Sequence, residues 1–199
     1  MTSQEFQSLF ISEKNKSMPF LKTAIEGLLV FEPQVWEDER GYFFESYNSN
    51  IFQAAGLQLD FVQDNQARSS YGVLRGLHYQ TGAYAQAKLV RVLEGEVLDI
   101  VVDLRPDSKT YGESYSIILS ASNQKQLLVP RGFAHGYAVL SPTATFFYKC
   151  DNFYNKTAEG GILYSDSTLN IDWHLPEQDI VLSKKDQVLH TFGNHKPAL

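Results

Sequence analysis

The chain has 199 residues, of which 43% are hydrophobic and 20% are charged, which fits one globular domain and excludes a disordered or fibrous protein. Its 17 Lys and Arg residues against 23 Asp and Glu residues give a net charge of −6, which argues against a nucleic-acid surface or a polybasic membrane patch. The single cysteine, Cys150, excludes an internal disulfide and a zinc finger. No apolar run approaches the roughly 20 residues that span a bilayer, and residues 1–20 are too polar for a signal peptide, so we expect a soluble cytoplasmic protein.

Short segments of alternating polarity predict an all-β protein. Residues 88–104 read as two strands around Glu94-Gly95-Glu96, which predicts a hairpin with positions 88, 90 and 92 on one face of its first strand. Further strands are predicted at residues 27–35, 43–47, 115–119, 126–129, 137–140, 145–149 and 161–164. Many short strands at this spacing indicate a sandwich, a jelly roll or a barrel.

One helix is predicted at residues 49–55, with Asn48 or Ser49 as its N-cap and Gly56 as its stop, and a second short helix is expected after Ser183. Residues 1–20 offer few apolar anchors and are expected to form an extension outside the core. We therefore place one domain at residues 21–189, followed by a weakly held C-terminal tail at residues 190–199.

Two segments carry the residues best suited to chemistry, 72–80 and 129–136. The spacing of Pro130, Gly132 and His135 resembles the second motif of the cupins, which are small jelly-roll barrels that often bind a metal. The first cupin motif supplies two histidines in metal-binding members, whereas the corresponding position here reads His78-Tyr79-Gln80. His78 and His135 alone make a poor metal site, so we expect no metal.

A barrel histidine without a metal suits proton transfer. Neutral imidazole takes a proton from a carbon next to a carbonyl if a carboxylate orients the ring and a cation stabilises the enolate. His78 is the candidate base, Lys88 the candidate cation and Tyr148 a candidate proton donor. The candidate phosphate ligands are Arg40, Arg75 and Arg131.

Each candidate also has an ordinary structural interpretation. A barrel histidine is more often a hydrogen-bonded core residue than a catalyst, and Tyr148 is a favoured strand residue. Lys88 fits a solvated strand position, Arg40 fits pairing with neighbouring acids, and Asp186 fits the start of a helical turn. Only the joint occurrence of these residues favours an active site.

The motifs occur together and in order, and over residues 23–186 the chain resembles the dTDP-4-dehydrorhamnose 3,5-epimerases. The matching segments include residues 38–46 (DERGYFFES), 61–65 (FVQDN), 73–80 (VLRGLHYQ), 86–91 (QAKLVR), 130–136 (PRGFAHG) and 182–186 (LSKKD). The resemblance implies a cupin-type jelly-roll barrel, a homodimer, and a reaction that needs neither metal nor cofactor. It also implies conversion of dTDP-4-dehydro-6-deoxy-D-glucose into dTDP-4-dehydro-L-rhamnose by inversion of C3 and C5.

The resemblance also implies roles for individual residues. His78 matches the base, Asp186 the carboxylate that orients it, Lys88 the group that stabilises the enolate oxygen, and Tyr148 the proton donor. Substrate-binding positions are implied at Arg40, Glu45, Gln63, Asp64, Asn65, Arg75, His135, Glu159 and Lys185. We expect the N-terminal strands, including residues 43–47, to exchange across the two-fold axis and to bring Arg40 and Glu45 to the partner's pocket.

Two positions depart from the family pattern: Gln66 stands where many relatives have His, and Phe153 where a second Tyr is common. Relatives that invert only C3 or only C5 share most of the motifs, so a single-centre epimerase of another dTDP-deoxysugar pathway is one alternative. A non-catalytic cupin that binds nucleotide sugars is a second alternative, and a metal-dependent cupin oxygenase is a more distant one.

Overall fold

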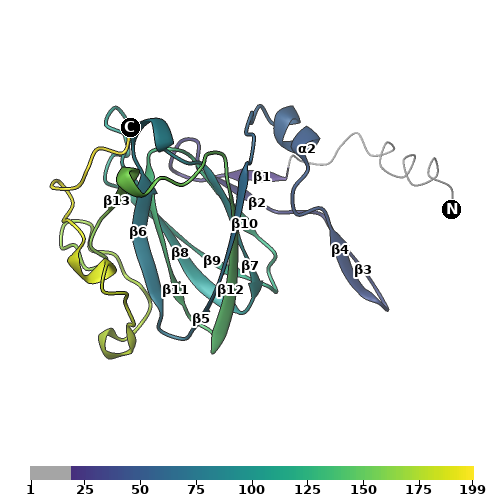
Figure 1. Cartoon of the computed structure of the whole chain (residues 1–199). Coiled ribbons are helices and arrows are strands. Elements are labelled where there is room, and N and C mark those ends of the chain that lie inside the picture. The colour runs from purple at the N-terminus through teal and green to yellow at the C-terminus, as the bar shows by residue number, and fades with distance from the viewer. Residues whose placement is uncertain (1–18) are drawn as a thin grey trace.

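The computed structural model describes residues 19–199, and within them two antiparallel sheets face each other (Figure 1). The strands of the six-stranded sheet are, in spatial order, β1 (Phe20–Lys22), β2 (Leu29–Phe31), β10 (Gln126–Val129), β7 (Lys88–Glu94), β12 (Thr143–Cys150) and β5 (Gln63–Ser70). Those of the five-stranded sheet are β13 (Glu159–Gly161), β6 (Leu74–Gln80), β11 (Phe133–Val139), β8 (Glu96–Asp103) and β9 (Ser114–Ser120). The predicted all-β, cupin-type jelly-roll architecture is confirmed.

The strand β7 shows how the alternating pattern fills the barrel. Val90 and Val92 belong to the apolar cluster between the two sheets, and Lys88 lies on the same face. Leu89 faces the other way and packs against the outer cluster around Phe52. The predicted common face for positions 88, 90 and 92 is therefore confirmed.

The predicted hairpin over residues 88–104 is wrong, although both of its strands exist. The strand β7 pairs with β10 and β12, whereas β8 pairs with β9 and β11 in the opposite sheet. Between them, Gly95 has a φ of +76°, and a Cβ atom there would lie 2.0 Å from the carbonyl oxygen of Thr143. The chain turns a barrel corner at this glycine, and an alternating pattern does not reveal which strands then pair.

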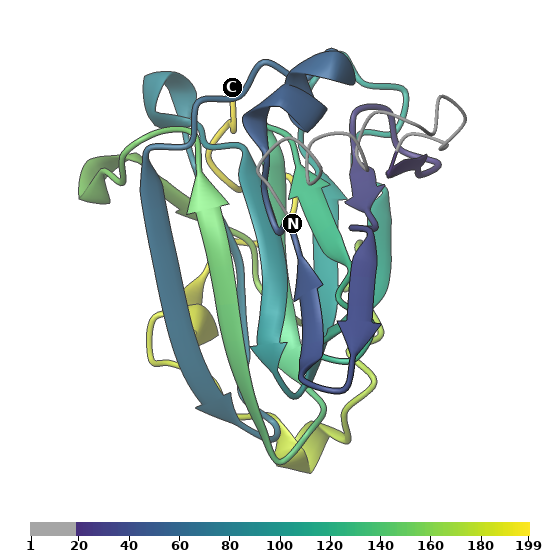
Figure 2. The same ribbon diagram turned by 90° about the vertical axis from the view of Figure 1, so that its right-hand side faces the viewer.

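The other predicted strands are confirmed with shifted ends. Residues 115–119, 126–129, 137–140 and 145–149 correspond to β9, β10, β11 and β12, while residues 27–35 contain the shorter β2 and 161–164 meet β13 only at Gly161. The strands β5 and β6 were not among those predicted. In β5 only Ser69 is buried, so its sequence lacks the apolar periodicity of a strand, and its pairing with β12 fixes it at the edge of the sheet (blue beside green, Figure 2).

The helical predictions agree with the structure. Helix α2 (Ser49–Ala54) begins after Asn48, whose side chain accepts a hydrogen bond from the Asn50 N–H, and Gly56 has a φ of +79°. Phe52 anchors this helix on Phe31, Leu89 and Leu128. The turn expected after Ser183 is the 3₁₀ helix η4; the 3₁₀ helices are η1 (Gly82–Tyr84), η2 (Lys156–Ala158), η3 (Glu177–Asp179) and η4 (Asp186–Val188).

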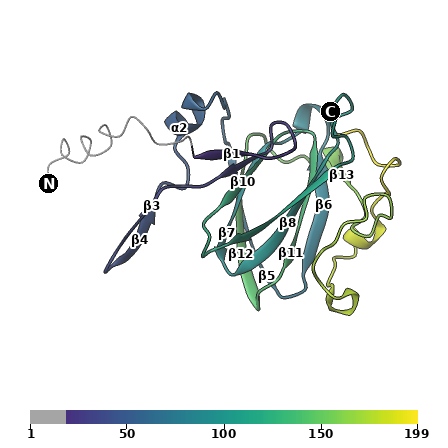
Figure 3. The same ribbon diagram turned by 180° about the vertical axis from the view of Figure 1, so that it is seen from behind.

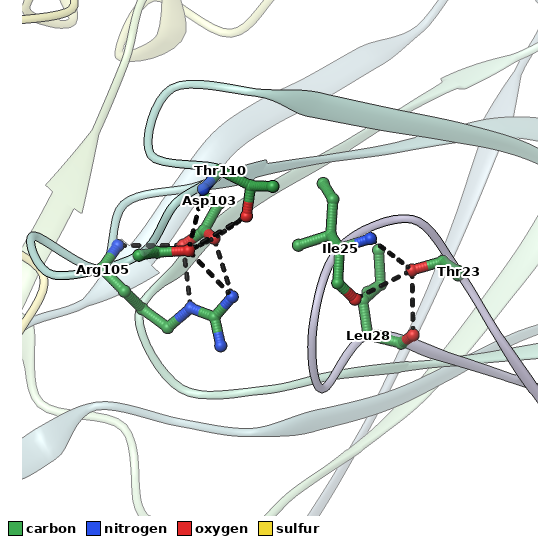
Figure 4. Close-up of polar contacts among 7 residues, drawn as sticks. Thr23, Ile25, Leu28, Asp103, Arg105 and Thr110 are labelled. Carbon is green, nitrogen blue, oxygen red and sulfur yellow. Dashed lines mark hydrogen bonds and ion pairs between the residues drawn. The ribbon is translucent and has the colours of Figure 1, made fainter.

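Polar side chains lock two loops of the barrel (Figure 4). The Asp103 carboxylate accepts hydrogen bonds from Arg105, Ser108 and Thr110. Burial by itself would raise the pKa of Asp103, but these hydrogen bonds lower it to about 2. In the other loop, Thr23 Oγ1 accepts from the Ile25 N–H and donates to the Leu28 carbonyl, which closes the turn between β1 and β2.

A two-stranded hairpin stands apart from the barrel. It consists of β3 (Val35–Asp38) and β4 (Gly41–Phe44), which form a sheet of their own that projects away from the two large sheets (Figures 1 and 3). The prediction of a strand at residues 43–47 is confirmed only in its first two residues. Tyr42 and Phe43 on this hairpin are 59% and 60% exposed, which is unusual for large aromatic side chains.

The expectation of a weakly held tail at residues 190–199 is wrong. The segment, yellow in Figure 3, lies on the side of the molecule away from the β3–β4 hairpin. Its carbonyls accept hydrogen bonds from distant residues: Lys196 O from the Tyr79 hydroxyl at 2.6 Å, and Ala198 O from the Gly82 N–H at 3.2 Å. Ala198 is 1% exposed. Backbone anchors of this kind have no sequence pattern, which is why the segment reads as a tail.

The predicted N-terminal extension at residues 1–20 lies outside the described residues up to position 18, and Phe20 already belongs to β1. In the described part of the chain, no helix is long and apolar enough to cross a membrane.

Asp166 anchors the C-terminal segment through a hydrogen bond from the Phe192 N–H, and its substitution tests how much this anchor stabilises the fold. This carboxylate is 5% exposed and accepts hydrogen bonds from the backbone N–H groups of Thr168, Leu169 and Phe192. We predict that Asp166→Ala lowers the free energy of unfolding in urea by about 3 kcal/mol, because it leaves buried donors unpaired. The control is Asp172→Ala, which removes an exposed carboxylate and should cost less than about 1 kcal/mol. Equal losses in the two variants would contradict the anchoring role.

Candidate active site

A cavity of about 410 Å³ lies between the two sheets and contains all four residues predicted to be catalytic. The strands β5, β6, β7, β11 and β12, residue 73 ahead of β6, and residues 181–186 supply its lining. The lining residues are Ala67, Val73, Leu74, Arg75, His78, Lys88, His135, Tyr137, Phe146, Tyr148, Val181, Leu182, Ser183, Lys185 and Asp186.

His78 on β6 and Asp186 at the start of η4 form a hydrogen-bonded pair. His78 Nε2 lies 2.6 Å from Asp186 Oδ1, and the Asp186 side chain is 4% exposed whereas that of His78 is 35% exposed. Burial by itself would raise the pKa of Asp186, but the hydrogen bond and charge of His78 and the charge of Lys185 bring it below its usual value. An ionised Asp186 accepts the Nε2–H, which leaves Nδ1 of His78 as the nitrogen that takes up a proton.

A second histidine and carboxylate pair lies deeper in the barrel. His135 Nε2 is 3.1 Å and 2.9 Å from the two carboxylate oxygens of Asp99, whose side chain is fully buried. Burial raises the pKa of Asp99, and the charges of His135 and Lys88 oppose that rise. Asp99 was not among the predicted site residues. The available indication was a single carboxylate within the otherwise apolar residues 97–102 of β8, since a charged side chain is rarely buried without a partner.

Lys88 and Tyr148 project into the cavity from neighbouring strands of the six-stranded sheet. Lys88 Nζ lies 5.9 Å from the centre of the Tyr148 ring. Burial lowers the pKa of Lys88, and the nearby Cys150 and Asp99 oppose that shift. Burial also raises the pKa of Tyr148 to about 12, so its hydroxyl keeps its proton at neutral pH.

Two further cationic side chains, Arg75 and Lys185, line the cavity. Arg75 donates from Nε and Nη2 to Ser69 Oγ, both at 3.2 Å, which fixes the direction of its guanidinium. Lys185 Nζ lies 2.7 Å from Oε2 of Glu159, and Oε1 of the same carboxylate accepts a hydrogen bond from the Tyr154 hydroxyl. Arg75, His135 and Lys185 are part of the cavity lining, and Glu159 contacts it through Lys185.

The strand β5 brings only part of its predicted set toward the barrel interior. Gln63 donates to Asn65, and Asn65 donates to the buried Cys150, so both lie on the inner face. Asp64 lies on the opposite face and forms an ion pair with Lys149 at 3.0 Å. Successive strand residues point to opposite sides, so the continuous Gln-Asp-Asn motif cannot place all three side chains in one pocket.

Three other predicted residues also lie outside the cavity lining. Arg40 occupies the turn of the β3–β4 hairpin, is 85% exposed and pairs with Asp38. Glu45 accepts a hydrogen bond from Asn48, and Arg131 pairs with Asp151. Within residues 19–199, neither Arg40 nor Glu45 belongs to the cavity lining.

Within residues 19–199, no three His, Cys, Asp or Glu side chains converge in a way that holds a metal ion. His78 and His135 are cross-strand neighbours, yet each faces its own carboxylate.

The His78–Asp186 pair predicts a pH-dependent contribution to stability. A carboxyl whose pKa is lower in the folded state stabilises the fold above its unfolded pKa, near 3.8, and this stabilisation is lost as the pH falls through the folded value. We predict that Asp186→Asn lowers the free energy of unfolding by about 2 kcal/mol at pH near 5, and that the difference from the unmodified protein shrinks below about pH 3. Urea denaturation at both pH values measures it, with the exposed Asp107→Asn as control. A difference that does not change with pH would contradict stabilisation of the fold by an ionised Asp186.

Comparisons with known proteins identify the family to which the chain is similar. Residues 22–194 match the family of dTDP-4-dehydrorhamnose 3,5-epimerases. An enzyme of that name from Shigella flexneri is 53% identical over 170 residues, covering 85% of this chain and 93% of the relative. The crystal structure of such an epimerase from Elizabethkingia anophelis NUHP1 is 56% identical with a TM-score of 0.85, covering 88% of this chain and 96% of that one.

Several of the similar solved structures hold ligands. The dTDP-6-deoxy-D-glucose-3,5-epimerase from Legionella pneumophila Philadelphia 1, in complex with dTDP-4-keto-L-rhamnose, is 45% identical with a TM-score of 0.84, covering 88% of this chain and 93% of that one. A 3'-monoepimerase from Streptomyces bikiniensis in complex with dTDP-quinovose is 30% identical with a TM-score of 0.79, covering 86% of each chain.

Proposed function

The chain belongs to the dTDP-4-dehydrorhamnose 3,5-epimerase family, and we propose how its cavity performs the reaction of that family. The enzyme inverts C3 and C5 of dTDP-4-dehydro-6-deoxy-D-glucose and forms dTDP-4-dehydro-L-rhamnose, a step toward dTDP-L-rhamnose. The observation that carries the mechanism is the His78–Asp186 pair on one side of the cavity and Tyr148 on the other.

His78 is the general base. The hydrogens on C3 and C5 are both acidic because both carbons lie next to the C4 ketone, so one base that reaches each in turn can form an enolate at either carbon. Asp186 accepts the Nε2–H of His78, holds the ring in one orientation, and stabilises the imidazolium that forms when Nδ1 takes the proton.

Lys88 stabilises the negative charge that develops on the C4 oxygen. Its ammonium group lines the cavity, where exclusion of water strengthens its attraction to an oxyanion. Asp99 supports the charged form of Lys88 against the effect of burial. Lys88 therefore supplies the electrostatic part of catalysis.

Tyr148 returns a proton to the face opposite His78. The two residues come from different sheets, His78 from β6 and Tyr148 from β12, so a sugar bound between the sheets has one on each side. Because the pKa of Tyr148 is about 12, its hydroxyl is protonated at neutral pH and ready to donate. Removal of a proton from one face and delivery to the other is what inverts a carbon centre.

Arg75, His135, Lys185 and Glu159 bind the nucleotide sugar, with Gln63 and Asn65 on the neighbouring face of β5. Arg75 and Lys185 supply the positive charge that a diphosphate requires. Asp64 lies on the outer face of β5 and does not contact the nucleotide sugar. Its ion pair with Lys149 links β5 to β12.

Arg40 and Glu45 serve the pocket of a second copy in a homodimer. The β3–β4 hairpin projects from the barrel and exposes Tyr42 and Phe43, as an element does when it packs on a partner. Pairing across a two-fold axis would cover these rings and carry Arg40 to the other copy. The proposal includes a cytoplasmic location, with which the free thiol of Cys150 is consistent.

Deuterium exchange separates the base from the acid. We predict that His78→Ala, incubated with dTDP-4-dehydro-6-deoxy-D-glucose in D₂O, loses exchange at both C3 and C5, because no enolate forms. Tyr148→Phe keeps exchange but loses about 10²-fold or more of inversion, because His78 still removes protons and returns them to the same face. Asp186→Asn slows both processes. Nuclear magnetic resonance follows deuterium and configuration at each carbon.

The same experiment tests the alternatives. Exchange at C3 alone, or at C5 alone, in the unmodified protein identifies a single-centre epimerase, and binding without any exchange identifies a non-catalytic binding protein. Full inversion by Tyr148→Phe contradicts the role of that residue. Activity should survive EDTA without added divalent ions; loss on chelation that one metal restores would favour the oxygenase type of cupin and contradict the mechanism.

Complementation tests the exchanged hairpin. We predict that Arg40→Ala and His78→Ala, each with little activity alone, regain inversion when co-expressed, because the mixed dimer contains one pocket with both residues intact. Co-expression of His78→Ala with Tyr148→Phe is the control: those residues share a pocket within one chain, so no intact site forms. Sedimentation of a monomer at micromolar concentration, or no regained activity, would contradict the proposal.

A further inference from the structure

The hydroxyl of Tyr137 is a buried polar group for which the described residues supply no hydrogen-bond partner. Tyr137 lies on β11, is 5% exposed, and lines the cavity. Its ring stacks on Phe146, with centroids 4.1 Å apart and planes 13° apart. Burying an unpaired hydroxyl costs stability, so such a group in a cavity wall points to a partner that arrives with a ligand.

The groups around the Tyr137 hydroxyl offer it a nearby donor but no acceptor within hydrogen-bond distance. Tyr137 pairs in register with Arg75 on β6 and with Asp99 on β8, and both carboxylate oxygens of Asp99 contact His135. Ser69 Oγ accepts two hydrogen bonds from Arg75, and the Ser69 hydroxyl, which keeps its own proton to donate, lowers the pKa of Tyr137. Among the described residues the proton of the Tyr137 hydroxyl has no acceptor within hydrogen-bond distance, so it needs one from the cavity.

We propose that the Tyr137 hydroxyl is a further substrate-binding group, which hydrogen-bonds an oxygen of the hexose of the bound nucleotide sugar. The inference rests on the proposed function. Tyr137 stacks on the same Phe146 ring that contacts Tyr148 and His135, which places it in the part of the cavity where the proposed acid lies. A hydroxyl both donates and accepts, which suits a sugar hydroxyl or ketone, whereas the cationic Arg75 and Lys185 suit the diphosphate.

Tyr137→Phe isolates the hydroxyl, because it keeps the ring and its stacking on Phe146. We expect the KM for dTDP-4-dehydro-6-deoxy-D-glucose to rise about three- to tenfold, the effect of one lost hydrogen bond. The Kd for dTDP-D-glucose, which has no ketone next to C3 or C5, should rise by the same factor, and the Kd for dTDP alone should not change. The melting temperature should stay equal or rise, because the variant removes an unpaired buried hydroxyl.

Tyr115→Phe is the matched control, since Tyr115 packs against the same core and does not line the cavity. It should leave KM and both Kd values unchanged. An unchanged Kd for dTDP-D-glucose in Tyr137→Phe overturns the inference, and so does an equal loss of affinity for dTDP, which would assign the hydroxyl to the diphosphate. A lower melting temperature with unchanged Kd values would show a structural hydroxyl and also overturns it. If the unmodified protein yields no epimerised product, the proposed function fails, while the two Kd values still decide the role of Tyr137.

Discussion

Charge inside a jelly-roll barrel must be paired, and this constraint organises the interior of the molecule. Asp99 and Asp186 are two carboxylates almost without exposure, and each contacts one histidine of the cavity. An unpaired carboxylate at either position would cost several kcal/mol. The pairs therefore fix the orientation of His78 and His135 and at the same time make their own burial possible. Lys88 adds a positive charge near Asp99, which couples the His135–Asp99 pair to the strand β7.

The division of the barrel into two sheets places the proposed base and the proposed acid on opposite walls of the cavity. The chain turns at Gly95 and carries β8 into the sheet opposite β7, which places Lys88 and Tyr148 on one wall and His78, His135 and Asp99 on the other. A base and an acid on opposite walls serve a reaction that must remove a proton from one face of a sugar and replace it on the other. Had residues 88–104 formed a hairpin within one sheet, β7 and β8 would have shared a wall.

Segments outside the two sheets also line this cavity. Lys185 and Asp186, just before and at the start of η4, belong to its lining, and Lys185 contacts Glu159 at the start of β13. The C-terminal segment contributes to the same region, since Lys196 Nζ donates to the carbonyl of Glu159 and its own carbonyl accepts from Tyr79 on β6. On the opposite side of the molecule, the β3–β4 hairpin leaves Tyr42, Phe43 and Arg40 exposed, and Arg40 does not line the cavity.

Sequence patterns alone were sufficient to predict the fold class, the inward face of β7, the capped helix α2, and the grouping of His78, Lys88, Tyr148 and Asp186 as one set. Each depends on local periodicity, on capping chemistry or on motifs that stand in order along the chain. The folded arrangement was needed to show that β7 and β8 separate at Gly95, that Asp64 and Asn65 face opposite sides of β5, and that residues 190–199 are anchored. It also revealed the buried Asp99 and the unpaired hydroxyl of Tyr137. These features depend on which strands pair and on contacts between residues far apart in the chain, and a one-dimensional pattern of polar and apolar residues records neither.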